Sequence, residues 1–128
     1  MLSRSDLIGF AATSNTTKAR KFYEETLGLT FVSADQFALV LEANGTMLRI
    51  QKVDQVNPHR YTVLGWKVVD ILTEVQTLSQ RGVLFARYEG MDQDENGIWT
   101  APSKARIAWF TDPDGNILSL TEFSREDA

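Results

Sequence analysis

The chain has 128 residues, enough for one ordinary domain with a buried core. Its 43% hydrophobic and 23% charged residues are typical of a globular protein, which excludes disordered and fibrous classes. The net charge of -4 argues against nucleic acid as a partner, and the absence of cysteine excludes disulfides and thiolate metal sites. The apolar run Leu7–Ala12 is too short for a signal peptide or a membrane span, so we expect a cytoplasmic, soluble protein.

The first half of the chain predicts the element order β-α-β-β-β. A strand over Asp6–Thr13 precedes helix-capping residue types at 14–17, and Gly28 is placed to end the helix that follows. The apolar residues of this helix recur at helical spacing: Ala19, Phe22, Tyr23 and Leu27. Three strands are then expected: Leu29–Ser33, Phe37–Ala43 and Thr46–Val53. The pair Asn44-Gly45 between the last two is typical of a tight β-hairpin.

The second half of the chain repeats this order. A strand over Tyr61–Val69 leads to Asp70, a helix-capping residue type, and to a helix that ends at Gly82. Three further strands are expected: Val83–Arg87, Ile107–Thr111 and Asn116–Glu122. The residues between the last two, Asp112-Pro113-Asp114-Gly115, predict a type I turn with proline at its second position.

The two halves align as a duplication with one insertion in the second copy. Asn44-Gly45 aligns with Asp114-Gly115, and Gly28 aligns with Gly82. We expect one α+β domain made of two tandem βαβββ modules that form a curved mixed sheet around a cleft. Its parts are a first module at about 6–53, a connector at 54–60, and a second module at about 61–123 with an inserted loop at 88–103.

The chain resembles the vicinal oxygen chelate superfamily, the group of glyoxalase, bleomycin-resistance and extradiol-dioxygenase-like proteins. The residues that carry the resemblance lie at 18–23 and 27–29, at 68–70 before the second helix, and at 112–116 before the last strand. The resemblance covers nearly the whole chain. It implies the duplicated fold, a small-molecule ligand in the cleft and a homodimer with two-fold symmetry.

Members of this superfamily that do chemistry hold one divalent metal in the cleft. The resemblance implies four ligand positions, which are Ile8, Arg49, Val63 and Ser119 here. Isoleucine and valine have no lone pair to offer, and the arginine cation would repel a metal ion. The residues two positions away bring no carboxylate or imidazole either: Phe10, Gly65, Met47, Gln51, Ile117 and Thr121. We therefore expect no metal and no cofactor.

Side chains alternate along a strand, so each strand predicts one face toward the cleft and one toward its helix. The face toward the cleft would carry Ile8, Phe10, Ala12, Met47, Arg49, Gln51, Val63, Gly65, Lys67, Ile117, Ser119 and Thr121. The face toward the helices would carry Leu7, Leu48, Ile50, Leu64, Trp66, Val68, Leu118 and Leu120. The first set mixes apolar with a few polar groups, as small-molecule pockets do.

From this face and the inserted loop we select seven candidate ligand-binding residues: Phe10, Met47, Arg49, Gln51, Lys67, Trp99 and Ser119. The Arg49 cation needs a partner, which is either Glu42 on the neighbouring strand or an acidic ligand group. Lys67 is alternatively a surface residue. Trp99 forms a lid or wall of the cleft, or fills a core gap or a subunit contact.

The favoured function is metal-free binding of a small, anionic or aromatic molecule, in the manner of bleomycin-resistance proteins. The alternative is a metal-dependent lyase, isomerase or dioxygenase whose ligands lie elsewhere, and a third reading is a scaffold that kept only the fold. No catalytic residue is identified, because the only histidine, His59, lies in the connector and is expected to be an exposed linker residue.

Overall fold

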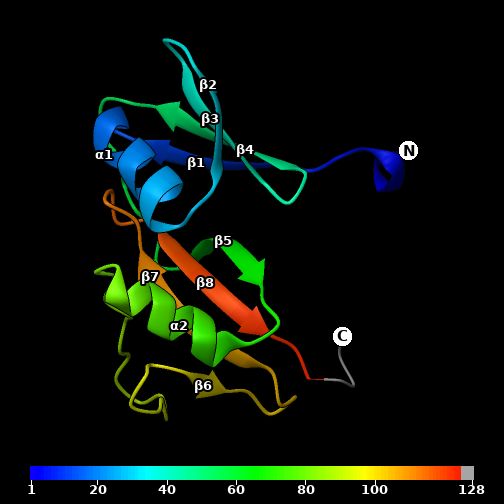
Figure 1. Cartoon of the computed structure of the whole chain (residues 1–128), viewed down its shortest axis with the longest axis vertical. Coiled ribbons are helices and arrows are strands. Elements are labelled where there is room, and N and C mark those ends of the chain that lie inside the picture. Colours follow the sequence, from blue (N-terminus) through cyan, green and yellow to red (C-terminus); the bar gives the residue numbers. More distant parts are fainter. Residues whose placement is uncertain (125–128) are drawn as a thin grey trace. The chain divides into compact units, whose positions relative to one another are not determined.

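The computed structural model describes residues 1–124. The chain divides into two compact units, each containing one four-stranded sheet of mixed direction (Figure 1). Unit 1 comprises Met1–His59 together with Asp112–Asn116, and unit 2 comprises Arg60–Thr111 and the chain from Ile117 onward. The predicted pair of βαβββ modules is confirmed. No helix within residues 1–124 is long and apolar enough to cross a membrane.

Unit 1 follows the predicted order, with a short 3-10 helix, η1 (Leu2–Arg4), before its first strand. Its elements are β1 (Ile8–Thr13), α1 (Thr16–Arg20), η2 (Lys21–Thr26), β2 (Thr30–Ala34), β3 (Ala38–Ala43) and β4 (Thr46–Lys52). The sheet order is β1-β4-β3-β2, and β1 runs parallel to β4. Asn44 and Gly45 have φ values of 47° and 84°, as the predicted tight hairpin requires.

The first helix begins as predicted and then changes type. The Asn15 side chain accepts a hydrogen bond from the Lys18 amide at the helix start. From Lys21 the turn widens into the π-helix η2, in which the Leu27 amide donates to the carbonyl of Phe22. A spacing of apolar residues does not distinguish this wider turn from an α-helix, so the sequence predicted one continuous helix.

The core of unit 1 lies between η2 and one face of its sheet. The residues buried there are Ala19, Tyr23, Leu39, Leu41, Leu48 and Ile50. The expectation that Leu7 packs with them is wrong, because Leu7 is 82% exposed. β1 starts at Ile8, two residues later than predicted, and Ile8 opposite Met47 is the first pair of the β1–β4 ladder. Leu7 therefore has no strand beside it.

The turn Asp112–Asn116 belongs to the core of unit 1. The Tyr23 hydroxyl donates a 2.6 Å hydrogen bond to Oδ2 of Asp112, and the Asn116 amide group donates to the same oxygen and to the carbonyl of Ala12. Oδ1 of Asp112 accepts from the backbone amides of Asp114 and Asn116. The predicted turn is confirmed, and its buried carboxylate is fully hydrogen-bonded.

Unit 2 has the strand order β5-β8-β7-β6, with β5 parallel to β8. Its elements are β5 (Thr62–Lys67), α2 (Ile71–Gln80), β6 (Trp99–Thr100), β7 (Arg106–Thr111) and β8 (Ile117–Glu122). The buried apolar residues on α2, β7 and β8 are Ile71, Val75, Leu78, Ala108, Phe110, Leu118 and Leu120. Leu118 and Leu120 are thus buried as predicted, whereas Leu64, Trp66 and Val68 are half-buried.

The predicted strand at 83–87 is wrong. This segment makes one backbone hydrogen bond to the sheet, from the Ala86 amide to the Trp109 carbonyl, and the fourth strand is instead β6, within the expected inserted loop. The Gln93 side chain bonds the Ala86 carbonyl and the Tyr88 amide, which are groups that a strand would use in its ladder. The backbone is satisfied without a strand.

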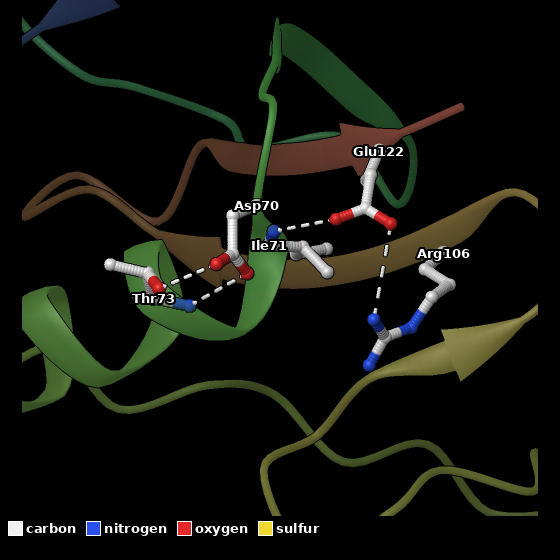
Figure 2. A network of polar contacts seen from close by, with 5 residues as sticks. All are labelled: Asp70, Ile71, Thr73, Arg106 and Glu122. Atoms are coloured by element: carbon white, nitrogen blue, oxygen red, sulfur yellow. Dashed lines mark hydrogen bonds and ion pairs between the residues drawn. The ribbon is translucent and has the colours of Figure 1, made fainter. Parts of the chain in front are cut away.

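Two acidic side chains fix the start of α2 in unit 2 (Figure 2). The Asp70 carboxylate accepts hydrogen bonds from the amide and the hydroxyl of Thr73, so it caps the helix as predicted. Oε1 of Glu122 accepts from the Ile71 amide at 3.0 Å, while Oε2 lies 3.9 Å from Nη1 of Arg106. Glu122 therefore connects the first turn of α2 with strands β7 and β8.

Candidate functional site

Each sheet has one face turned away from its helix, and these two faces carry most of the predicted ligand-binding residues. In unit 1 the parallel pairing sets Ile8 opposite Met47, Phe10 opposite Arg49, and Ala12 opposite Gln51. Paired residues point to the same side of a sheet. Phe10 is 49% exposed and Met47 is 40% exposed, so this face presents large apolar side chains to solvent.

Arg49 lies half-buried in the middle of this face, with Phe10 on one neighbouring strand and Val40 on the other. Glu42, one of its two expected partners, lies opposite Met47. No ion pair within 4.0 Å joins Arg49 to any residue in 1–124. The guanidinium lies beside apolar side chains without a paired carboxylate among the described residues. The exposed Asp35 senses its charge, because the pKa of Asp35 is lowered first by hydrogen bonds from the Ala38 and Phe37 amides and further by the charges of Arg49 and Lys52.

In unit 2, Ser119 is opposite Gly65 on one side and Trp109 on the other. A β-carbon on Gly65 would lie 2.9 Å from Oγ of Ser119, so only glycine fits there without a shift of the serine. Ser119 is buried, whereas Lys67, two residues beyond Gly65, is exposed near its strand's end. Nζ of Lys67 lies 6.0 Å from the ring centre of Phe123.

Three aromatic rings gather beside Ser119 on the same face, and we call them the aromatic cluster: Tyr88, Trp99 and Trp109. The Trp99 and Trp109 ring centres are 6.2 Å apart, and the Tyr88 ring meets Trp109 edge-on at 5.7 Å. Trp99 is half-buried and forms part of the short strand β6, while the neighbouring Ile98 is the residue that fills the core. The cluster is a partly exposed aromatic surface.

The sequence reasoning missed two members of the aromatic cluster. Trp109 alternates with the buried Ala108 and Phe110 on β7, so strand periodicity alone would have assigned it to the face of Ser119. Tyr88 lies in an irregular segment, where no periodicity applies, and its backbone amide donates a hydrogen bond to the Gln93 side chain. Of the predicted residues, Trp99 belongs to the cluster and Ser119 lies opposite its member Trp109, whereas Lys67 lies farther along the face.

The metal-binding positions implied by the fold do not suit a divalent ion. In unit 1 they hold Ile8 and Arg49, neither of which can donate a lone pair to a cation. In unit 2, Val63 lies at an irregularity of the β5–β8 pairing and Ser119 offers one neutral hydroxyl. Within residues 1–124 no three histidine, cysteine, aspartate or glutamate side chains group as metal ligands would.

A hollow of about 430 Å³ lies on the other face of unit 1, between the helical segments and Leu39. Its rim carries charges of both signs, and two of them, Arg20 and Glu24, form an ion pair at 3.0 Å. The Arg20 guanidinium also lies over the Phe31 ring, 3.6 Å from its centre. Because these side chains are paired with each other, the hollow is a weaker candidate than the exposed faces.

A comparison against known families agrees with the fold. The Glyoxalase/Bleomycin resistance protein/Dioxygenase superfamily matches residues 8–120. The chain belongs to this superfamily. Among curated proteins, no match was found.

Solved structures of this superfamily are similar over almost their full length. A member from Sphaerobacter thermophilus DSM 20745 is 28% identical, with a TM-score of 0.70 over 91% of this chain and 96% of that one. The glyoxalase family protein from Enterococcus faecalis is 22% identical, with a TM-score of 0.74 over 95% and 100%. TnmS3, an antibiotic-binding protein from Streptomyces sp. CB03234, is 22% identical, with a TM-score of 0.68 over 94% and 98%.

Proposed function

We propose that this protein binds a small molecule with an apolar or aromatic body and an acidic group, and that it holds this ligand rather than converting it. The observation that carries the proposal is the environment of Arg49. Arg49 is a half-buried cation on β4, and the exposed side chains of Phe10 and Met47 lie on the same sheet face. A ligand carboxylate, sulfonate or phosphate would pair with the guanidinium, and the apolar side chains would contact the ligand body.

The energetics of an arginine on such a face favour an acidic ligand. A guanidinium that is partly removed from water loses hydration, and the loss is recovered only through an oppositely charged hydrogen-bond acceptor. Gln51, two residues along β4 on the same face, supplies an amide that can also hydrogen-bond an acid. Unit 2 by itself offers a separate apolar surface, the aromatic cluster, on which a flat ring can stack.

Two considerations support binding over catalysis. One structurally similar relative, TnmS3, is an antibiotic-binding protein. The metal positions of the fold carry Ile8, Arg49, Val63 and Ser119, which do not suit the metal that catalytic members would use. A metal-dependent lyase, isomerase or dioxygenase would instead be indicated by stoichiometric zinc, nickel, manganese or iron in the purified protein.

A pair of dyes tests the role of Arg49. The first dye, 8-anilinonaphthalene-1-sulfonate, has an aromatic body and a sulfonate; the second, N-phenyl-1-naphthylamine, has the same body without the charge. We expect Arg49→Ala to raise the Kd of the sulfonate about tenfold, as the loss of one charge-assisted hydrogen bond predicts. The Kd of the uncharged dye should change less than about twofold.

Lys52→Ala is the matched control for this experiment. Lys52 lies on β4 like Arg49, but it borders the hollow on the face that carries the helices. Its removal deletes the same charge without touching the exposed face, so binding of both dyes should stay unchanged. The proposal is wrong if Arg49→Ala and Lys52→Ala weaken sulfonate binding equally, or if neither dye binds the wild-type protein below its unfolding temperature.

We also propose that the protein forms a homodimer. Each sheet has two outer strands, and the described chain exposes large apolar side chains that a second copy could cover, among them Leu2, Leu7 and Phe37. Sedimentation equilibrium should give twice the chain mass at tens of micromolar, roughly the range in which weak dimers dissociate. A single-chain mass at that concentration would contradict the proposal.

A further inference from the structure

One side-chain amide holds the two aromatic residues that unit 2 adds to its sheet face. Oε1 of Gln93 accepts a 2.7 Å hydrogen bond from the Tyr88 amide. Nε2 of Gln93 donates to the carbonyls of Ala86 and Gly97, both at 2.9 Å. Gln93 also forms an isolated β-bridge with Trp99. Both ends of this amide therefore bond the backbone at three separate points.

The segment around Gln93 is folded tightly by its own contacts. Oδ1 of Asp94 accepts hydrogen bonds from the amides of Asn96 and Ile98, and the carbonyl of Asp94 accepts from Nη1 of Arg87 at 2.6 Å. Gly97 and Ile98 are both buried. A loop that opens as a lid needs a weakly bonded backbone, whereas the backbone around Gln93 is hydrogen-bonded at several points and its end at Gly97 and Ile98 is buried.

We propose that Gln93 is a positioning residue that holds Tyr88 and Trp99 against Trp109, so that the aromatic cluster is a preformed wall for a flat apolar ligand on the sheet face of unit 2. This inference rests on the proposed function for its consequence in binding. The amide fixes the backbone at Gly97, two residues before β6, on one side and at Tyr88 itself on the other. A wall that is ordered before binding spares the ligand the entropy of ordering it.

The chemistry of the amide makes the role of Gln93 specific. Glutamate has nearly the same shape, and its ionised carboxylate could still accept from the Tyr88 amide, but it has no hydrogen to donate to the carbonyls of Ala86 and Gly97. Two carbonyl oxygens would then face a negative charge. Protonation would return one O–H donor, so Gln93→Glu should behave more like the wild type as the pH falls.

Circular dichroism of the tryptophans measures the arrangement of the aromatic cluster directly. Two indoles with centres 6.2 Å apart couple their transitions, and Trp99→Phe identifies the band that this pair produces. We expect the band to be lost in Gln93→Leu and in Gln93→Glu at pH 8. In Gln93→Glu it should return in part at about pH 5, where a carboxyl near carbonyls becomes protonated. Gln76→Glu, on the exposed side of α2, makes the same charge change and should keep the band.

Binding of N-phenyl-1-naphthylamine measures the consequence for the ligand. We expect its Kd to rise about tenfold in Gln93→Glu at pH 8, which corresponds to about 1.4 kcal/mol, and to stay unchanged in Gln76→Glu. All variants are compared below their unfolding temperatures. The inference is overturned if the dichroism band persists in both Gln93 variants, or if the band is lost while dye affinity stays at the wild-type value. If the wild type binds no dye, the proposed function fails, whereas the dichroism still decides whether Gln93 positions the rings.

Discussion

Tyr23 and Asp112 are 89 positions apart in the sequence, yet the phenol of one donates a 2.6 Å hydrogen bond to the carboxylate of the other inside unit 1. Burial raises the pKa of Tyr23, and the charge and the hydrogen bond of Asp112 raise it further. The phenol therefore stays protonated, and a hydrogen-bond donor, above the pH at which a free tyrosine ionises. The carboxylate, with its other donors, organises the whole turn.

Removal of the Tyr23 hydroxyl group should destabilise the protein measurably. We expect Tyr23→Phe to lower the free energy of unfolding by about 2 kcal/mol, within the range for a hydrogen bond to a charged group. The buried Asp112 loses one donor and no water can replace it easily. Urea unfolding measures the change, and Tyr88→Phe, at a partly exposed ring, is the control that should shift it by only a few tenths. An unchanged midpoint in Tyr23→Phe would contradict the role assigned to this pair.

Acid should weaken the start of α2 through Asp70. The hydrogen bonds from the Thr73 hydroxyl and amide hold the pKa of Asp70 below its ordinary value. Because the pKa is lower in the folded than in the unfolded chain, the carboxylate stabilises the fold above its ordinary pKa, and this contribution is lost as the pH falls through the lowered folded value.

Asp70→Asn separates this effect from general acid unfolding. Asparagine also caps helices but does not titrate, so the stability difference between the wild type and the variant should shrink as the pH falls below the ordinary pKa of about 3.9. Chemical unfolding at a series of pH values gives this difference. A difference that stays constant through the acid range would show that the Asp70 charge has no part in stability.

The contact between Gly65 and Ser119 predicts that a substitution at one position changes the effect of a substitution at the other. A β-carbon on Gly65 would lie 2.9 Å from Oγ of Ser119, so Gly65→Ala should destabilise unit 2 by about 1 kcal/mol. Ser119→Ala removes that oxygen, and the double variant should regain most of the lost stability. A double-mutant cycle by thermal unfolding measures this coupling, and additive effects of the two substitutions would refute it.

Metal addition and removal should leave the protein unchanged. The positions that the fold offers to a metal carry Ile8, Arg49, Val63 and Ser119, which supply no carboxylate or imidazole. We expect EDTA, or an excess of zinc, nickel or manganese, to leave the thermal unfolding midpoint within experimental error. Elemental analysis of untreated protein should find less than stoichiometric metal, and one ion per chain that survives dialysis would favour the metal-dependent alternative.

Features set by neighbouring residues were predicted correctly from the sequence. Asn15 and Asp70 cap their helices, and the hairpin at Asn44-Gly45 has the positive φ angles that its residues favour. Each of these depends on backbone groups within a few positions. Alternation along the strands likewise placed Phe10 with Arg49 on one face.

Features that depend on contacts between residues far apart in the sequence could not be predicted in this way. Residues 83–87 have the composition of a strand, but the Gln93 side chain takes up hydrogen-bonding groups of the neighbouring backbone. The π-turn at 21–26 and the burial of Tyr23 accompany a bond to Asp112, which no local pattern reveals. The position of Glu42 opposite Met47, and not opposite Arg49, also required the strand register. The dimer, the cytoplasmic location and the absence of nucleic acid partners stay predictions.

The inclusion of Asp112–Asn116 in unit 1 bears on how this duplicated chain could be divided. A peptide that ends at His59 contains every strand and helix of unit 1. It lacks the Asp112 carboxylate, which accepts a hydrogen bond from the Tyr23 hydroxyl, and the Asn116 amide group, which donates to the Ala12 carbonyl. If the two halves are expressed separately, we expect the first half to fold natively only when it binds the second half, which carries residues 112–116.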